Sequence, residues 1–465
     1  MAIPGETTGP TDAALFRDAV ERAIRYLHDL PDRPVFPREG ATNRLSELDL
    51  SLPDGPTDPR LVLALLDEIG SPATVASPGG RYFGYVIGGS LPAALAAHWL
   101  ATAWDQNAVF RATSPVSAFV EDVALRWILE VLTLPPDWRG GFVTGTTMGH
   151  VAGLAAARHA VLERQGWDVE RDGLFGAPPI RIVTSAHAHA TLFRAARLIG
   201  LGDGRVVRVP VDEQGRMIPT RLPELDASTI LCAQAGNVDG GSFDPLPELV
   251  DAARASGAWI HLDAAFGLWA RATPRHAQLL HGLEDVDSCA ADLHKWLNVP
   301  YDNGVILVRG SAANSLRSAL RMQGAYFPEE DARDRGRWTP DASRRARGVD
   351  AWAALLSLGR SGLAELVDRN CGFARRFADG LASAGYSVLN DVVLNQVLVS
   401  FGSDTETQAV IEGIQADGTC WCSGTHWNGR AAMRISVCSW ATTPDDVERS
   451  LESMLRIAER VRSGS

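Results

Sequence analysis

Between residues 85 and 310, short apolar runs alternate with stretches in which apolar residues recur at helical spacing. Apolar runs of four or five residues bounded by glycine, proline or polar residues predict buried strands, and the stretches between them predict helices. The expected strands are 181–184, 206–209, 229–233, 259–263 and 305–308, and the expected helices are 116–132, 151–164, 189–198 and 246–256. This alternation is typical of a mostly parallel sheet covered by helices on both faces, so we expect a large α/β domain here.

The two flanking parts of the chain have different patterns. Residues 1–80 predict a helix over 13–28, capped by Asp12, and another apolar helical face over 61–69, with prolines at 31, 34, 37, 53, 56 and 59. After a charged, aperiodic stretch over 324–342, which predicts a mobile loop, a long helix from residue 349 leads into helices at 374–384, 406–415 and 444–461 and strands at 395–401 and 433–437. We therefore expect an N-terminal arm (1–80) that packs on another surface, a large α/β domain (81–345) and a small C-terminal α+β domain (346–465).

Charge and hydropathy exclude several classes of protein. The net charge of −12, with arginine and acid interspersed, argues against a nucleic-acid partner. The most apolar stretch, 90–104, contains His98 and is too short to span a bilayer, and the N-terminus lacks the pattern of a signal peptide. Six cysteines in 465 residues, with one C-x-C pair, suggest reduced buried thiols rather than disulfides or a metal site. We expect a cytoplasmic protein with no membrane partner and no metal.

The chain has 43 arginines but a single lysine, Lys295. Codon bias can replace lysine by arginine wherever only a positive charge is needed. Arginine cannot replace an amine nucleophile, because its guanidinium is not deprotonated in proteins. Lys295 is therefore a candidate for covalent chemistry, and the alternative is that drift left one lysine behind.

Polar residues follow several of the predicted strands. His187 and His189 come after the strand 181–184, Asp263 closes the strand 259–263, and His294 and Lys295 follow an apolar segment around 286–291. Ligands of open parallel sheets bind beyond the carboxyl ends of the strands. These side chains are expected to converge at one edge of the sheet.

A glycine-rich turn over 140–149 leads into the helix that begins near His150. Such a turn presents N–H groups and hydroxyls at a helix N-terminus, where the helix dipole favours a phosphate. It matches neither G-x-G-x-x-G nor a P-loop, so a dinucleotide or nucleoside triphosphate is not indicated. The alternative is an ordinary glycine turn capped by threonine.

One amine, one carboxylate, an imidazole and a phosphate cradle are together what pyridoxal 5'-phosphate needs. Its aldehyde forms a Schiff base with a lysine, and its pyridine nitrogen needs a carboxylate to keep it protonated as an electron sink. Its phosphate suits a helix N-terminus, and an imidazole can stack on its ring.

Two segments carry a specific family resemblance. His261-Leu-Asp-Ala-Ala-Phe-Gly267 and Asp292-Leu-His-Lys-Trp-Leu297 resemble the signatures of the group II pyridoxal-phosphate-dependent amino-acid decarboxylases, relatives of aromatic-L-amino-acid and glutamate decarboxylase. The resemblance extends from about Arg81 through the C-terminal domain. It implies the aspartate-aminotransferase-like (fold type I) α/β fold, pyridoxal 5'-phosphate as cofactor and a homodimer with shared active sites.

The resemblance also assigns roles to individual residues. It implies that Lys295 binds the cofactor, that Asp263 pairs with the pyridine nitrogen and that His189 stacks on the ring, with His187 as a neighbour. Further implied cofactor contacts are Gly145, Thr146, Thr147 and His294 near the phosphate, Ala265 beneath the ring, Asp292 where the family often has Asn, and Asn237 where it often has Thr.

The implied substrate contacts are less specific. They are Tyr82, Phe83, Trp104, Asn107 and Arg434, with Trp421 and His426 as further candidates. Aromatic walls suit an aromatic or bulky side chain, and an arginine suits a carboxylate. The alternative for each residue is ordinary core packing.

The resemblance implies decarboxylation of an L-amino acid to the amine through an external aldimine and a quinonoid. The family's loop tyrosine, which protonates the carbanion, has no counterpart in 334–340, so Tyr326 or His294 is the candidate proton donor. This departure keeps two other outcomes open: a decarboxylation-dependent aldehyde synthase and a carbon–carbon lyase acting on an amino acid. A catalytically silent homologue retained for binding is a further alternative.

Overall fold

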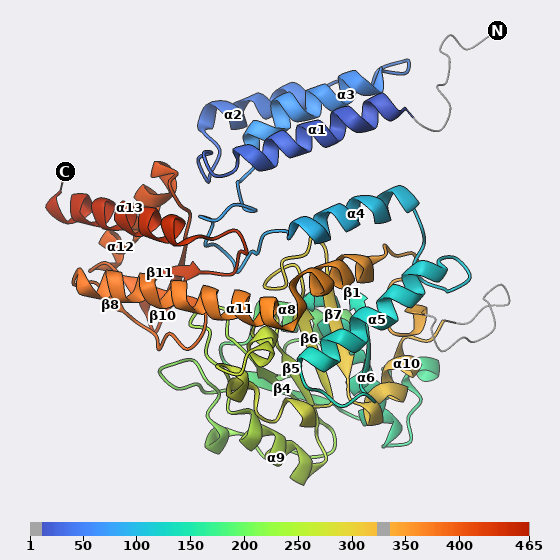
Figure 1. Cartoon of the computed structure of the whole chain (residues 1–465). Coiled ribbons are helices and arrows are strands. Elements are labelled where there is room, and N and C mark those ends of the chain that lie inside the picture. The colour runs from blue at the N-terminus through green and yellow to red at the C-terminus, as the bar shows by residue number, and fades with distance from the viewer. Residues whose placement is uncertain (1–11, 323–334, 465) are drawn as a thin grey trace, which may run out of the picture.

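A computed structural model describes residues 12–322 and 335–464 (Figure 1). The large domain is built on a seven-stranded sheet in the order β1-β7-β6-β5-β4-β2-β3. Its strands are β1 Arg139–Val143, β2 Arg181–Ser185, β3 Val206–Val209, β4 Thr229–Gln234, β5 Trp259–Asp263, β6 Ser288–Asp292 and β7 Gly304–Val308. Only β7 runs opposite to the other six strands of this sheet, which confirms the predicted fold class.

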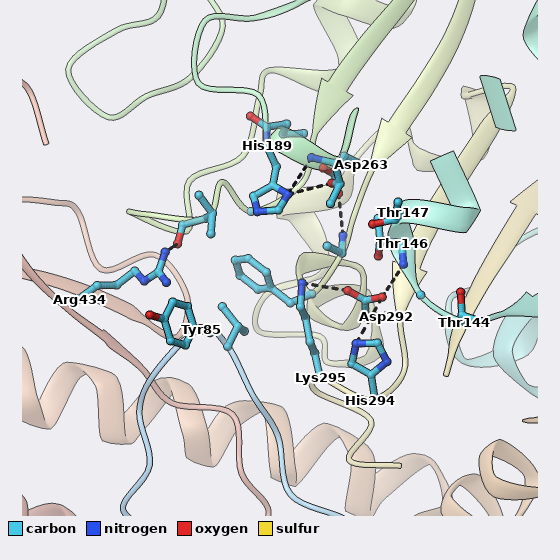
Figure 2. A pocket seen from close by; sticks show the side chains of 18 residues that line it. Tyr85, Thr144, Thr146, Thr147, His189, Asp263, Asp292, His294, Lys295 and Arg434 are labelled. Carbon is cyan, nitrogen blue, oxygen red and sulfur yellow. Dashed lines mark hydrogen bonds and ion pairs between the residues drawn. The ribbon is translucent and has the colours of Figure 1, made fainter. Parts of the chain in front are cut away.

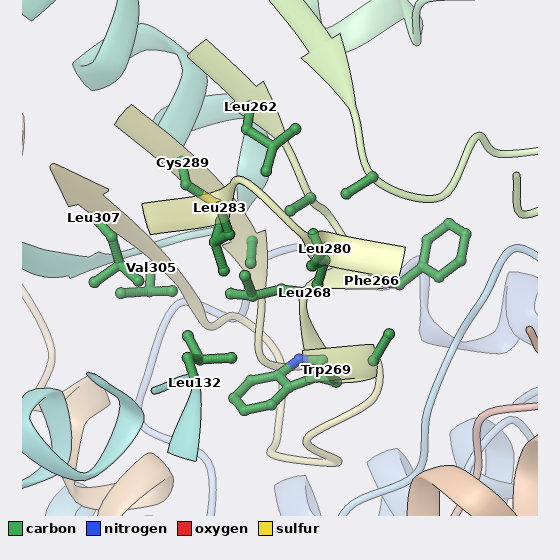
Figure 3. Close-up of a cluster of buried hydrophobic side chains, with 14 of the residues drawn as sticks. Leu132, Leu262, Phe266, Leu268, Trp269, Leu280, Leu283, Cys289, Val305 and Leu307 are labelled. Carbon is green, nitrogen blue, oxygen red and sulfur yellow. The ribbon is translucent and has the colours of Figure 1, made fainter. Parts of the chain in front are cut away.

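Successive residues of each central strand point to opposite faces of the sheet, and both faces are covered by helices. Ile182, Ile230 and Ile306 pack in one hydrophobic cluster with α6 Thr146–Glu163, α8 Ala190–Leu198 and α10 Ala313–Ala319. The other face packs against α5 Pro115–Val131, α9 Leu246–Ser256 and the first part of α11 Arg347–Ser383. Figure 3 shows part of this second cluster, where Leu262 and Leu307 of the sheet lie with Trp269 and Leu132.

The C-terminal part forms an α+β unit with its own core. Its four strands, β8 Ser387–Val388, β9 Gln396–Ser400, β10 Ser423–Trp427 and β11 Arg430–Ser436, pair in the order β10-β11-β9-β8, and they pack with α12 Asp404–Asp417 and α13 Pro444–Ser463. The helix predicted at 374–384 is not separate, because α11 continues through it and is interrupted earlier, at Gly359 (φ 61°). The strand β10 was not predicted, although Asn428 and Gly429 both have the positive φ of a tight hairpin turn.

The N-terminal helices stand apart from the rest of the chain in Figure 1, above α4 Pro92–Trp104. They are α1 Ala13–Asp29, α2 Glu39–Asn43 and α3 Pro59–Leu65, with short turns η1 Arg44–Leu48, η2 Leu66–Gly70 and η3 Ser71–Ala73. Asp12 caps α1 as expected, because its carboxylate accepts the N–H of Leu15. None of α1, α2 and α3 has a fully buried residue, so their apolar side chains are at most partly covered within the described part of one chain.

Two segments differ from the predictions next to the site. Residues 140–143 of the glycine-rich turn form strand β1, and α6 begins at Thr146 rather than near His150. Most of the predicted mobile loop, including Tyr326, lies outside the described residues. Beyond the short turn η9 Arg335–Arg337, however, Trp338 and Thr339 are buried, so this end of the loop is packed. No helix among the described residues is long and apolar enough to cross a membrane.

The remaining short elements are α7 Val169–Asp172 and the turns η4 Pro219–Arg221, η5 Gly267–Ala272, η6 Ala277–Leu280, η7 Leu283–Asp285 and η8 Gly310–Ala312. The domain boundaries at 80/81 and 345/346 stay a prediction.

Candidate active site

A cavity of about 550 Å³ opens at the carboxyl ends of β4, β5 and β6, beside the N-terminus of α6 (Figure 2). The structure brings ten of the predicted site residues to its wall. They are Gly145, Thr146, Thr147, His189, Asp263, Ala265, Asp292, His294, Lys295 and Arg434. Figure 2 places Thr146 and Thr147 at one end, Tyr85 and Arg434 at the other, and Lys295 between them.

Lys295 is held by the aspartate that ends β6. Its Nζ lies 2.9 Å from Asp292 Oδ2, and Asp292 Oδ1 accepts the N–H of Thr146 at 2.6 Å. Burial alone would raise the pKa of Asp292, but the charges of Lys295 and His294 and these hydrogen bonds lower it below its ordinary value. Asp292 therefore ties the lysine to the first turn of α6. The backbone also comes close, since a Cβ added at Gly88 would clash with the Lys295 carbonyl oxygen.

Asp263 is buried at the end of β5. Its Oδ1 accepts the N–H of Ala265 at 3.1 Å, and its Oδ2 lies 3.3 Å from His150 Nε2. Burial would raise the pKa of Asp263, but His150 beside it, together with His189 and Lys295, holds the pKa well below the ordinary range. The group at this strand end is therefore a carboxylate.

His189 caps α8 and faces the cavity. Its Nδ1 lies 2.8 Å from the hydroxyl of Thr191, and burial lowers the pKa of the ring although Asp263 opposes that effect. The structure places His187 outside the cavity wall, with its ring edge-on to Trp427 at a centroid distance of 5.5 Å. A neutral imidazole at position 189 presents a flat aromatic face.

His294 has a defined tautomer. Its Nδ1 accepts the N–H of Asn303 at 3.1 Å, so the neutral ring carries its proton on Nε2. The ring stacks on Tyr301 with centroids 4.3 Å apart, and burial lowers the pKa of His294. An N–H donor is thus available at the cavity wall beside Lys295.

Three polar atoms in the wall of the cavity have no hydrogen-bond partner in the described structure. They are the hydroxyl of Thr146, Oε1 of Gln234 and Nε of Arg434, and all three side chains are buried. Buried polar atoms are nearly always hydrogen-bonded, so these three indicate a polar ligand. Together with the N-terminus of α6, they fit a phosphorylated cofactor with further polar ring substituents.

Two predicted substrate contacts do not reach the cavity because they belong to other packing. Tyr82 is buried, with its ring stacked on Trp421 at 5.0 Å, and Phe83 is 1% exposed against Phe377 in the core of the small domain. Tyr85 and Val86 line the cavity in their place. Both have positive φ (53° and 58°), which turns the chain in a way that side-chain alternation cannot reveal.

The other predicted site residues that lie outside this cavity have identifiable structural contacts. Asn107 accepts the N–H groups of Val109 and Arg344, and Trp104 lies 43% exposed at the end of α4. The structure places Asn237 outside the cavity wall, where its amide contacts Ser242 and accepts the N–H of Gly240. Gln234, at the end of β4, lines the cavity instead and could have been predicted because it ends a buried strand. His426 lies on β10, away from this cavity.

The fold and the cavity define an α/β protein that binds pyridoxal phosphate. A family profile described as the pyridoxal-dependent decarboxylase conserved domain matches residues 61–402. The chain therefore belongs to the pyridoxal-dependent decarboxylase family. This confirms the resemblance read from the two motifs and the predicted cofactor.

Individual relatives and solved structures agree with the family assignment. The chain is 28% identical to human "Acidic amino acid decarboxylase GADL1" over 71% of this chain, a match that spans 65% of that protein. It is 26% identical to "Tryptophan decarboxylase 1" of Oryza sativa subsp. japonica over 94% of this chain and 92% of that protein. The crystal structure of Oryza sativa TDC with PLP and tryptamine superposes with a TM-score of 0.90 at 23% identity, covering 98% of this chain and 99% of that one.

Proposed function

We propose that this chain decarboxylates an L-amino acid with an aromatic or bulky side chain and releases the amine. One observation carries the proposal: the only lysine of the chain shares a cavity with a buried carboxylate and the N-terminus of α6. Bound pyridoxal phosphate supplies a sink for the electron pair that remains on the substrate when carbon dioxide leaves. The protein then has to bind the cofactor, keep its ring nitrogen protonated and orient the substrate.

Each of these tasks falls to residues in a different part of the cavity. Lys295 would hold the cofactor covalently, and the N-terminus of α6 at Thr146 and Thr147 would receive the phosphate. Asp263 would keep the ring nitrogen protonated, since a buried carboxylate stabilises a proton on its partner. His189 would cover one face of the ring.

The end of the cavity opposite α6 favours an apolar substrate side chain. The ring of Tyr85 and the side chains of Val86, Val238 and Phe266 line the cavity. Arg434 lies there too, but its guanidinium donates to the carbonyl of Val238 at 2.9 Å and stands 3.6 Å from the Asp239 carboxylate. Because Asp239 compensates this positive charge, a second substrate carboxylate gains little from Arg434, which supports an aromatic or bulky side chain.

His294 is our proposed proton donor for the carbon from which carbon dioxide departs. A neutral ring that gave up its only N–H proton would become an imidazolate, so His294 must first take a second proton from solvent. Its Nε2 lies at the cavity wall, 3.7 Å from Asp292 Oδ1. The lack of a tyrosine in 334–340 favours a second candidate, an aldehyde synthase in which oxygen, rather than a proton, captures the electrons. That reaction consumes oxygen and water and yields aldehyde, carbon dioxide, ammonia and hydrogen peroxide.

The proposed function predicts a product ratio. With purified protein, added pyridoxal phosphate and a panel of L-amino acids, we expect carbon dioxide and amine in equal amounts, with the highest kcat/KM for tryptophan, tyrosine or phenylalanine. Aldehyde, ammonia and peroxide in equal amounts would instead establish the synthase reaction, and cleavage products without carbon dioxide would establish a carbon–carbon lyase. Lysine labelling without turnover of any amino acid would indicate a silent homologue.

We further propose that two copies of the chain form a dimer that shares its active sites. Helix α1 leaves Phe16 58% exposed and Ile24 54% exposed, and α3 leaves Leu61 and Val62 each 53% exposed. An amphipathic helix normally buries its apolar face, and contiguous exposed apolar residues mark interaction sites. We propose that a second copy of the chain covers this apolar surface, because the family resemblance implies a homodimer.

Size-exclusion chromatography tests whether the chain forms a dimer. We expect the chain to elute at about twice 49.9 kDa, and the double variant Phe16→Asp, Ile24→Asp to shift toward the monomer and lose activity. Leu52→Asp is the matched control, because Leu52 is 94% exposed outside these helices and should leave the dimer intact. A fully active monomer would refute the proposal.

A further inference from the structure

A line of polar contacts runs from Asp263 along β5, beneath α6. Three of them are hydrogen bonds, and the first, between His150 Nε2 and Asp263, is a close charge contact that is not aligned as a hydrogen bond. His150 Nε2 lies 3.3 Å from Asp263 Oδ2, and His150 Nδ1 lies 2.9 Å from His261 Nε2. His261 Nδ1 lies 2.7 Å from the hydroxyl of Ser288, which accepts the indole N–H of Trp259 at 3.0 Å. Trp259, His261 and Asp263 are alternate residues of one strand, so their side chains share the face covered by α6.

This line of groups is sealed from water. His150, His261 and Ser288 are 0% exposed and Trp259 is 5% exposed. Burial and the neighbouring His150 together lower the pKa of His261 to about 3, so this ring is neutral. Because water does not reach these groups, each of their N–H and O–H protons needs an acceptor among the same groups.

The chemistry of the two ends fixes where the protons lie. An indole nitrogen only donates, so the Ser288 hydroxyl accepts from Trp259 and gives its own proton to His261 Nδ1. His261 then carries its proton on Nε2 and donates it to His150 Nδ1. His150 in turn carries its proton on Nε2, which faces the Asp263 carboxylate. Three of these protons are used in hydrogen bonds, and the fourth, on His150 Nε2, lies against the Asp263 carboxylate at 3.3 Å.

The reversed arrangement is unfavourable at both ends. If His261 donated to Ser288, the serine hydroxyl proton would lose its partner in a buried site. His150 would then present a lone pair to the Asp263 carboxylate, where two negative regions would face each other. A buried polar group without its partner costs about 1–3 kcal/mol.

We propose that Trp259, Ser288, His261 and His150 form a one-directional relay that holds an N–H donor against Asp263 and so fixes the carboxylate toward the cofactor's ring nitrogen. These four are positioning residues, because only Asp263 reaches the cofactor. The glycine at position 153 of α6 makes room for the relay, since a Cβ there would lie 2.6 Å from the His261 ring. The proposal rests on the bound cofactor and not on the decarboxylation itself.

The other titratable groups around Asp263 act differently. They are His189 at the start of α8, Lys295 after β6, and the thiols of Cys232 on β4 and Cys289 on β6. Burial raises the pKa of both thiols, so they stay neutral, and His189 and Lys295 lie on the cavity side. Among these groups, the relay alone approaches the carboxylate from beneath α6.

The test is a pH titration of the visible absorbance of the lysine-bound cofactor. A proton on the ring nitrogen lowers the pH at which the Schiff-base nitrogen gives up its own proton. We expect His150→Leu to raise that midpoint by about one pH unit, a tenfold change in the equilibrium, and to weaken cofactor binding in the same preparation. His150→Gln, whose amide can accept from His261 and donate to Asp263, should restore most of both.

Trp259→Phe tests the far end of the relay without touching the cavity. It should raise the midpoint in the same direction by a smaller amount. Trp138→Phe is the matched control, because Trp138 is 1% exposed in the core on the other face of the sheet and should leave the midpoint unchanged. Equal shifts from the two tryptophan variants, or no shift in His150→Leu, would overturn the proposal.

A cofactor-free measurement provides a second readout. In histidine-labelled protein without cofactor, nitrogen NMR should show His150 and His261 as neutral rings protonated at Nε2, with assignments from His150→Gln. Either ring protonated at Nδ1 instead would overturn the relay even if His150→Leu failed to fold. None of these readouts depends on turnover, so they can succeed while the proposed reaction fails.

Discussion

Lys295→Arg is expected to abolish turnover, by at least about a thousandfold, because it removes the only side-chain amine in the chain. Arginine keeps the positive charge opposite Asp292, which in the wild type lies 2.9 Å from the lysine Nζ. It cannot form the covalent bond to the cofactor, since its guanidinium stays protonated. The lost activity therefore reports on the covalent bond to the cofactor and not on the positive charge at this position. Steady-state kinetics with added pyridoxal phosphate measures this loss.

The single lysine also makes the chemical labelling unambiguous. Borohydride reduction of the wild-type protein should place one phosphopyridoxyl group on Lys295, and Lys295→Arg should lose both this label and the visible absorbance. Because the chain has no other lysine, the N-terminal amine is the only competing amine that the sequence offers. A label confined to the N-terminus, or full activity in the arginine variant, would refute the role of Lys295.

The convergence of Lys295, Asp263 and His189 could be predicted from the sequence because parallel strands impose it. Each residue follows a short apolar run, and the carboxyl ends of parallel strands meet at one edge. The same runs located β2, β3, β4, β5 and β7 to within a residue. Strand β1 was missed because its glycines resemble a turn, although its backbone pairs with β7.

Other parts of the site depend on backbone conformation and tertiary contact. Tyr85 and Val86 reach the cavity through positive φ angles, which their residue types do not predict, whereas Tyr82 and Phe83 pack in the interior. The partnership of His150 with Asp263 joins α6 to β5 across more than a hundred residues, and no local pattern encodes it. Composition and periodicity predict individual helices and strands. Contacts such as the one between His150 and Asp263 depend on how those helices and strands pack together, so the same signals do not predict them.

Asp263→Asn is the second change with a large expected effect. Asparagine keeps the size of the side chain but cannot hold a proton on the ring nitrogen by charge, so the electron sink is lost. We expect kcat to fall by at least about a thousandfold while Lys295 still takes the borohydride label. The visible band should also keep its protonated form to higher pH, for the reason given for His150→Leu. Undiminished activity would remove Asp263 from its assigned role.

A control separates this effect from the general cost of removing a buried acid. Asp287→Asn alters a carboxylate that accepts the N–H of Ile260 and pairs with Arg309, close to the start of β5 and remote from the cavity. It should lower stability without moving the midpoint of the visible band. If Asp263 works through the relay, the midpoint should move most in Asp263→Asn, less in His150→Leu and least in Trp259→Phe. That order follows the hydrogen-bond path from the carboxylate outward, whereas simple loosening of the core would follow the volume removed and would place the aspartate variant last.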